Sequence, residues 1–236
     1  MSVILNGKAL AERIKGQLQA QVAALPKGRS PMLGILAFQD PASKVYLKAQ
    51  EEQARALGIV PMPVSLPPTA TLQDVEAVIQ RWNADATIHG IFVHQPMPAQ
   101  IDAQRVSTLI EPRKDIEGIH PQNSARRFFA KARIGSCTAL AVMELLDATG
   151  VNLAGKEAVV VGHSEIVGRP VSMLLLDRLA TTTICHLWTD QAGRLEEHVR
   201  RAEVLVVAIG RPQHIQGAWI RPGAIVIDVG INVVDR

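Results

Sequence analysis

The sequence predicts two α/β domains, the second a Rossmann-like doubly wound parallel sheet, with a cleft between them. Short β-branched runs alternate with helix-like segments, which is typical of a parallel sheet covered by helices. Apolar residues make up 47% of the 236-residue chain, enough for a core, whereas aromatic residues make up only 3%. A stretch rich in Pro, Gly and charge at 111–137 interrupts the alternation. We therefore expect one domain at 1–120, a junction at 121–137 and a second domain at 138–236.

The first domain should contain three helices and three strands. Its second helix follows the turn-like sequence DPA, where Ser43 can act as N-cap, and Gly58 can end it. Thr71 can cap the third helix in the same way. We expect the helices at 9–25, 43–58 and 71–85 and the strands at 31–38, 58–66 and 88–98.

The second domain repeats this alternation after a helix that ends at Gly150. Its strands are rich in Val and Ile, as expected for strands buried on both faces. We expect the helices at 138–150, 168–180 and 193–202 and the strands at 157–163, 181–187, 204–210 and 224–232.

Charge and cysteine content disfavour several classes of protein. The net charge is +3 and the pI about 9.1, but no Lys/Arg run is long enough for a nucleic-acid arm. Cys137 and Cys185 lack CxxC spacing, so neither a disulfide framework nor a metal site is expected. The start of the chain does not resemble a signal peptide, and no apolar run reaches the roughly 18 residues of a membrane span. The mild positive charge suits an anionic small molecule equally well, and we expect a cytoplasmic protein with no nucleic-acid or membrane partner.

A strand-to-helix turn in VVVGHSEIVGRP (159–170) is the first candidate ligand site. Backbone N–H groups at such a turn commonly hold a phosphate. Ser164 stands where the second glycine of GxGxxG would be, so the motif alone also fits an ordinary turn. The segments at 206–212 and 226–232 each end a buried strand with glycine, and CHLWTD should bring its last residues near a ribose. Three glycine-bearing strand ends favour a dinucleotide crevice.

Tyr46, the single tyrosine of the chain, and Gln50 lie one helical turn apart and share a helix face. By themselves they fit a surface helix with an amphipathic ring lying over it.

Seven motifs then appear in a fixed order: NGKALA, DPASKVYLKAQ, GIFVHQPMP, KDIEGIHPQN, VVVGHSEIVGRP, CHLWT and IVIDVGIN. Over essentially the whole chain they resemble the bifunctional methylenetetrahydrofolate dehydrogenase/cyclohydrolase family, commonly called FolD. The resemblance implies a folate substrate held between the domains, and its oxidation with NADP or NAD. It also implies hydrolysis of the methenyl product to 10-formyltetrahydrofolate and a homodimer formed through the nucleotide domain.

The resemblance assigns residues to both halves of the site. The catalytic residues would be Tyr46, Gln50 and His94, and the substrate-binding residues would be these three with Gln95, Pro96 and Glu117. The cofactor-binding residues would be Thr138, Gly162, His163, Ser164, Ile166, Val167, Arg169, Ala208, Gly210, Gly230, Ile231 and Asn232.

Three of these positions depart from the family pattern. The family has its proton-handling lysine at Gln50, a glutamine partner of that lysine at His94, and a pterin-clamping aspartate at Glu117. An amide cannot titrate, so we expect a dehydrogenase with weak or absent cyclohydrolase activity. Alternatively, His94 replaces the lysine in a rewired relay, the protein is a paralogue that binds folate or nucleotide in a regulatory role, or it acts on a modified one-carbon carrier.

Further departures bear on the cofactor and on the end of the chain. The family segment PCTPxG reads SCTALA here, so Ser136, Ala139 and Ala141 replace its residues. Leu187 replaces a serine that often helps to hold a 2′-phosphate; His163 and Arg169 could supply positive charge, whereas Asp190 would repel a 2′-phosphate if it pointed inward. NADP is the family default, but NAD fits as well. The family also continues beyond the position of Arg236, so the protein is naturally short or the sequence is part of a longer one.

Overall fold

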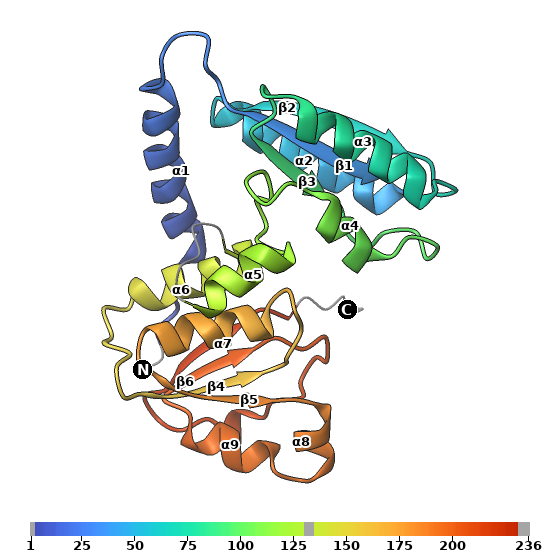
Figure 1. Cartoon of the computed structure of the whole chain (residues 1–236). Helices are drawn as coiled ribbons and strands as arrows, with labels where there is room; N and C mark the ends of the chain where they lie inside the picture. The colour runs from blue at the N-terminus through green and yellow to red at the C-terminus, as the bar shows by residue number, and fades with distance from the viewer. Residues whose placement is uncertain (1–2, 130–134, 231–236) are drawn as a thin grey trace. The chain divides into compact units, whose positions relative to one another are not determined.

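The computed structural model describes residues 3–129 and 135–230. The chain divides into two compact units, one of residues 6–125 and the other of residues 126–236 with 1–5 (Figure 1). Each unit is built on its own parallel sheet, so the predicted pair of α/β domains is confirmed.

The first unit is a three-stranded sheet with strand order β2-β1-β3, and all its strands are parallel. Its elements are α1 (Gly7–Ala23), β1 (Met32–Phe38), α2 (Pro41–Ala56), β2 (Val60–Leu66), α3 (Leu72–Ala84), β3 (Gly90–Val93) and α4 (Ala103–Leu109). The strand at the edge, β2, carries Pro61 and Pro63, which an edge strand tolerates because its outer N–H groups need no partner.

The two faces of this sheet are covered by different helices, and Figure 1 shows α2 and α3 on opposite sides of it. Leu36 and Phe38 of β1 pack with Val75, Ile79 and Trp82 of α3 in the main core. The α3 side is tightly packed, since a Cβ at Gly34 would lie 2.8 Å from the Trp82 ring.

The start of α2 differs from the prediction. Asp40, not Ser43, is the N-cap, and its carboxylate accepts a hydrogen bond of 2.9 Å from the Ser43 N–H. The reason is Pro41, which lacks an N–H and fits the first helical position with its fixed φ. At the other end Gly58 has φ +80°, as a terminating glycine should. Thr71 caps α3 as predicted, in a capping box with Asp74.

The second unit is a four-stranded parallel sheet with strand order β5-β4-β6-β7. Its elements are α6 (Cys137–Asp147), β4 (Glu157–Val161), α7 (Gly168–Asp177), β5 (Thr181–Cys185), α8 (Leu187–Gln191), α9 (Leu195–Arg201), β6 (Val204–Val207), the 3₁₀ helix η1 (Gly217–Trp219) and β7 (Ile225–Asp228). A further helix, α5 (Pro121–Phe128), occupies the stretch expected to be an irregular junction.

Two cores lie on opposite faces of this sheet. One joins α6 and α7 to alternate residues of β4 and β6, including Val160 and Val206, and the other joins α9 to Val161 and Val207. Helices on both faces of a parallel sheet make the doubly wound, Rossmann-like arrangement that the sequence predicted. The strands end two to four residues earlier than predicted, and α8 begins at Leu187, inside the stretch predicted as the end of a strand.

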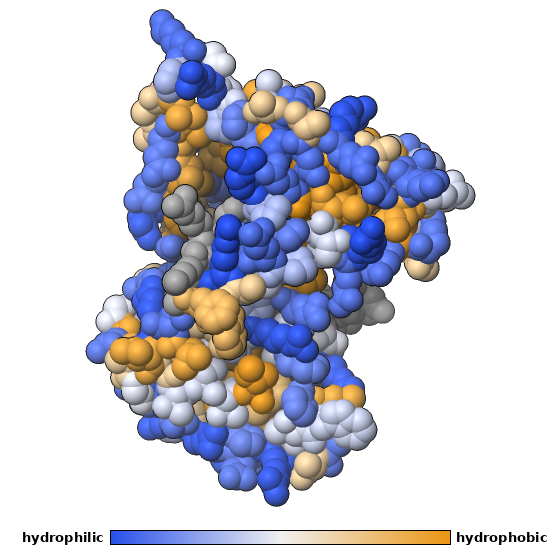
Figure 2. All heavy atoms as spheres, viewed as in Figure 1, coloured by the Kyte–Doolittle hydropathy of each residue, from blue (hydrophilic) through white to orange (hydrophobic). Residues whose placement is uncertain are grey.

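Hydrophilic residues cover most of the face drawn in Figure 2, with apolar residues exposed in several groups. Within the described part of the chain, no helix is both long and apolar enough to cross a membrane.

Candidate functional site

Three predicted site residues meet at the end of β3. His94 directly follows this strand, and its backbone N–H donates to the Leu36 carbonyl at 2.8 Å, which continues the pairing with β1. From α2, Gln50 brings its Oε1 to 2.7 Å from the Nε2 of His94. The Tyr46 ring, one helical turn earlier, meets the His94 ring edge-on at a centroid distance of 5.2 Å.

The polarity of the Gln50–His94 hydrogen bond follows from its atoms. An amide oxygen can only accept, so Nε2 of His94 carries the proton and the Gln50 NH₂ group is turned away from the ring. His94 is 1% exposed, and this burial lowers the pKa of its imidazole below the ordinary value of 6.5; the Asp40 carboxylate opposes the shift. Tyr46, in contrast, is 56% exposed. The cluster presents a phenol ring and a neutral amide, with the imidazole behind them.

Gln95 and Pro96 follow His94 as an exposed pair joined by a cis peptide bond. Glu117 lies on a segment that runs beside β3, because Asp115 forms a parallel bridge with Ile91. The Glu117 side chain is half-buried, and burial together with the charge of Asp115 raises its pKa to about 7. It is therefore a carboxyl group that changes charge near neutral pH.

Asp115 fixes the backbone around Glu117. Its buried carboxylate accepts hydrogen bonds from the backbone N–H groups of Glu117, Ile119 and His120, at 2.9–3.3 Å, and from the Asn123 amide at 2.8 Å. The resemblance had singled out Glu117 and left Asp115 without a role. Its position two residues before Glu117 in KDIEG, ahead of a turn, is the sequence signal for this loop-anchoring function.

In the second unit the carboxyl ends of the four strands form one edge. Val161 of β4 pairs with Cys185 on one side and with Val207 on the other, and Val207 pairs with Asp228 of β7. The residues that follow these strands therefore line the place where doubly wound sheets bind their ligands.

Two glycines keep this edge clear of side chains. Gly162 has φ +118°, and a Cβ there would lie 2.3 Å from the Ala208 carbonyl oxygen. At Gly168, the first residue of α7, a Cβ would lie 2.1 Å from the Gly162 carbonyl oxygen. The turn between them thus packs closely against β6 and leads directly into a helix N-terminus, an arrangement that fits the pyrophosphate of a dinucleotide.

Hydrogen bonds from two serines organise this turn. The Ser164 hydroxyl accepts from the N–H groups of Val167 and Gly168, at 3.2 and 3.4 Å, so the residue in place of the second glycine closes the turn itself. Ser136, the buried N-cap of α6, donates its hydroxyl to the Ile166 carbonyl at 2.5 Å. Ser136 therefore ties the turn to the start of α6.

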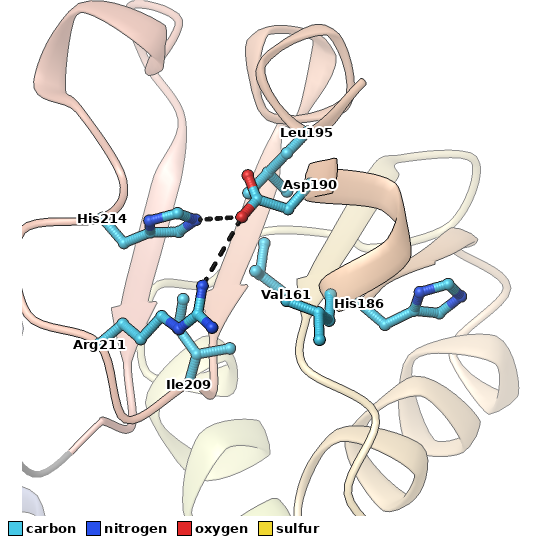
Figure 3. A pocket seen from close by; sticks show the side chains of 8 residues that line it. Val161, His186, Asp190, Leu195, Ile209, Arg211 and His214 are labelled. Carbon is cyan, nitrogen blue, oxygen red and sulfur yellow. Dashed lines mark ion pairs between the residues drawn. The ribbon is translucent and has the colours of Figure 1, made fainter. Parts of the chain in front are cut away.

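A pocket of about 150 Å³ opens at the same edge (Figure 3). Asp190 of α8 lines it, 3.8 Å from the guanidinium of Arg211 and 3.1 Å from Nε2 of His214. The ring of His186, which also lines the pocket, is turned away from this cluster in Figure 3. The remaining lining residues are Val161, Leu187, Leu195 and Ile209.

The other predicted cofactor residues take several positions. Thr138 is the second residue of α6, and the ring of exposed His163 lies tilted against that of His186 at a centroid distance of 5.3 Å. Exposed Arg169 forms an ion pair with Glu165. Gly210 follows β6, and Gly230, two residues beyond β7, donates to the Asp228 carboxylate. Ile231 and Asn232 lie outside the described residues. No role was predicted for Arg211 and His214, although an arginine and a histidine shortly after a glycine-ended strand are a usable signal for a site at this edge.

Family models match both units. The tetrahydrofolate dehydrogenase/cyclohydrolase catalytic domain matches residues 5–117, and the NAD(P)-binding domain of the same name matches residues 136–236.

Relatives with similar sequences and structures span nearly the whole chain. The chain is 45% identical to the bifunctional protein FolD 2 of Geobacter sulfurreducens over 99% of its length and 82% of that protein. A crystal structure of the bifunctional FolD methylenetetrahydrofolate dehydrogenase/cyclohydrolase of Campylobacter jejuni matches with a TM-score of 0.95 at 34% identity, over 99% of this chain and 83% of that one. The Trypanosoma brucei FolD, solved with NADP and an inhibitor, matches with a TM-score of 0.93 at 35% identity, over 99% and 81%.

Proposed function

Because the chain belongs to the tetrahydrofolate dehydrogenase/cyclohydrolase family, we propose that it oxidises 5,10-methylenetetrahydrofolate and has little or no cyclohydrolase activity. The observation that carries the second half is the hydrogen bond of 2.7 Å between Gln50 and His94. It joins two uncharged side chains at the positions where the family has a lysine and its glutamine partner.

The residues of the first unit would bind the folate. The exposed Tyr46 ring offers a flat surface for the pterin and its one-carbon unit, and the Gln50 NH₂ group faces away from His94 as a hydrogen-bond donor. The Glu117 carboxylate, when ionised, can accept two hydrogen bonds from the amino group and N3 of the pterin. The loop anchored by Asp115 would hold Glu117 in place for this contact.

Oxidation needs positioning more than proton transfer. A hydride leaves the methylene carbon of the substrate, which becomes the methenyl cation, and no proton is released in this step. A bound nicotinamide dinucleotide supplies the hydride acceptor. The Gly162–Gly168 turn and the strand-end residues Ala208, Gly210 and Gly230 would hold it. Gln50 is sufficient for this half-reaction, because the step requires no titratable group from it.

Hydrolysis of the methenyl cation makes a different demand. Water adds to the cation and a proton must leave, and general acid–base catalysis typically speeds such a step by about 10²–10⁴-fold. Gln50 cannot accept that proton. His94 is neutral at pH 7 because its pKa is lowered, but it is buried and its Nε2 already donates to Gln50. This geometry favours loss of the hydrolytic half.

A rewired relay, in which His94 serves as the base, is the second candidate. The direct bond from His94 to the residue that replaces the lysine favours it. Substitution of His94 by asparagine separates the two candidates. Hydrolysis that falls at least tenfold while oxidation stays within a few-fold would support the relay, whereas hydrolysis near the uncatalysed rate in both proteins would support its loss.

The decisive experiment restores the family pair. The purified protein and its Q50K/H94Q variant are assayed for oxidation of methylenetetrahydrofolate and for hydrolysis of methenyltetrahydrofolate. We expect hydrolysis to rise at least tenfold in the variant, with oxidation changed only a few-fold. Gln53→Lys, which adds the same charge at an exposed position of α2, is the matched control and should leave both rates unchanged. Hydrolysis by the unmodified protein at the rate of its own oxidation would overturn the proposal.

The same assays address the remaining alternatives. Tight nucleotide binding without oxidation of any folate would favour a regulatory paralogue, and oxidation of a different reduced pterin alone would favour a modified carrier. We also expect a homodimer from the resemblance, which sedimentation of the intact protein checks.

A further inference from the structure

The residues that line the pocket beside β5 indicate which dinucleotide the second unit accepts. The pocket lining comes from the carboxyl ends of three strands: Val161 is the last residue of β4, His186 follows β5, and Arg211 and His214 lie in the loop after β6. In doubly wound sheets the segment after the second strand of the motif, here β5, meets the 2′ position of the adenosine ribose. This position distinguishes NAD, which has a hydroxyl there, from NADP, which has a phosphate.

Asp190 dominates the charge of this pocket. Its carboxylate is shared between two groups from the loop after β6, at 3.8 Å from Arg211 and 3.1 Å from His214 (Figure 3). The titratable side chains that line the pocket are Asp190, Arg211, His214 and His186, whose ring is turned away from the cluster. Among the lining residues that the structure describes, the Arg211 guanidinium and the His214 imidazole are therefore both already paired with the Asp190 carboxylate.

Leu187, the first residue of α8, adds no polar group to the pocket. Leu187 follows His186 and is 47% exposed at the pocket. An apolar side chain there can pack against a ribose but cannot donate a hydrogen bond to a phosphate. The remaining lining residues, Val161, Leu195 and Ile209, are apolar as well.

The side chains around Asp190 should bind the adenosine ribose of NAD and that of NADP with different affinities. A 2′-hydroxyl can donate a charge-assisted hydrogen bond to the Asp190 carboxylate without disturbing its ion pairs. A 2′-phosphate brings about two negative charges near that carboxylate, and it would have to displace Asp190 from Arg211 and His214 to be bound by these two side chains itself. We propose that Asp190 makes the pocket select NAD over NADP, with Arg211 and His214 holding its carboxylate in the selecting position.

This inference deepens the proposed function, since it names the cofactor that the oxidation would use. It can nevertheless be tested without folate. The intact protein is titrated calorimetrically with NAD and NADP, and then with adenosine 5′-monophosphate and adenosine 2′,5′-bisphosphate, which differ only in the 2′-phosphate. We expect each compound without the 2′-phosphate to bind at least tenfold more tightly than its partner.

Substitution of Asp190 by asparagine should reverse this preference. The variant frees Arg211 and His214, so we expect NADP to bind at least tenfold more tightly than it does to the unmodified protein, while NAD binds a few-fold more weakly. Asp177→Asn, which removes an equal charge at the far end of α7, is the matched control and should leave the ratio unchanged. The D190N/R211Q double variant should lose the gain for NADP, and this comparison remains informative if D190N is less stable.

The outcomes separate the two proposals. Equal or tighter binding of NADP by the unmodified protein, or an unchanged ratio in D190N, would overturn the inference about Asp190. Selective binding of NAD together with absence of folate oxidation would overturn the proposed function alone.

Discussion

Nε2 of His94 lies 2.7 Å from Oε1 of Gln50, so two of the three residues at which the sequence departs from the resembled family pattern are hydrogen-bonded to each other. The bond links α2 to the residue after β3 across 44 positions of sequence. It explains how a buried histidine is accommodated after β3, because the proton on Nε2 has a hydrogen-bond acceptor within the protein.

Burial of His94 makes the stability of the protein depend on pH. Its folded-state pKa lies below the unfolded value of 6.5, so the unfolded chain takes up the proton first as the pH falls. The free energy of unfolding should therefore decrease below about pH 6.5, by at most about 1.4 kcal/mol per pH unit from this one group. In urea unfolding at a series of pH values, His94→Gln should remove this part of the slope. His163→Gln, at an exposed position, should keep it, and equal slopes in both variants would contradict the assignment.

Glu117 should make the free energy of unfolding depend on pH in the opposite direction from His94. Its pKa is raised from 4.5 to about 7, so the unfolded chain loses the proton first as the pH rises. The free energy of unfolding should fall as the pH rises from about 4.5 to about 7. Glu117→Gln should therefore be more stable than the unmodified protein at pH 8 and similar to it at pH 4, as measured by urea unfolding. The exposed substitution Glu52→Gln should show no such difference.

The affinity for folate should depend on the ionisation of the Glu117 carboxyl group. Because an ionised Glu117 carboxylate would hold the pterin, the Michaelis constant for folate should decrease as the pH rises through about 7. Glu117→Gln should bind folate more weakly and lack this dependence. A variant that keeps the pH dependence would show that another group controls binding.

Ser136 should control nucleotide affinity without taking part in the reaction. Its hydroxyl holds the Ile166 carbonyl at 2.5 Å, and a hydrogen bond of this kind contributes about 1 kcal/mol. Ser136→Ala should therefore weaken the binding of NAD and NADP equally, by about fivefold, with the turnover number unchanged. Ser136→Thr, which keeps a hydroxyl, should restore most of the affinity. A change in the NAD to NADP ratio would instead link Ser136 to selectivity.

Gly168 should tolerate no side chain. A Cβ at this position would lie 2.1 Å from a backbone carbonyl oxygen, so Gly168→Ala must shift either the turn or α7. We expect a loss of about 1–3 kcal/mol in the free energy of unfolding and weaker nucleotide binding. Gly217→Ala meets open space at a backbone conformation that any residue can adopt, and it is the control in thermal unfolding and calorimetry. Equal stabilities of the two variants would contradict the close packing.

The helices and strands could be predicted from the sequence where the spacing of their apolar residues was regular. The residues at which they begin and end could not be predicted in this way. The start of α2 was decided by Asp40 and Pro41, because a cap and a proline outweigh the neighbouring serine. The helix α5 was not predicted, since PQNSARRF contains few apolar residues and lies in a stretch rich in Pro, Gly and charge, which favoured an irregular junction.

In the candidate site, too, local features could be predicted from the sequence, whereas contacts between distant residues could not. The spacing of Tyr46 and Gln50 on one helix face followed from helical periodicity. The contact of both with His94, like that of Asp190 with Arg211 and His214, depends on how strands and helices pack, which no local pattern contains.

The central claim is that oxidation occurs without the hydrolysis that follows it in the family. The most direct test is one reaction of the purified protein with methylenetetrahydrofolate and NAD, in which reduced nucleotide, methenyltetrahydrofolate and 10-formyltetrahydrofolate are measured together over time. We predict that methenyltetrahydrofolate accumulates in step with the reduced nucleotide and decays only at the rate seen without protein. Formation of 10-formyltetrahydrofolate at the rate of nucleotide reduction, with no accumulation of the methenyl compound, would contradict the account.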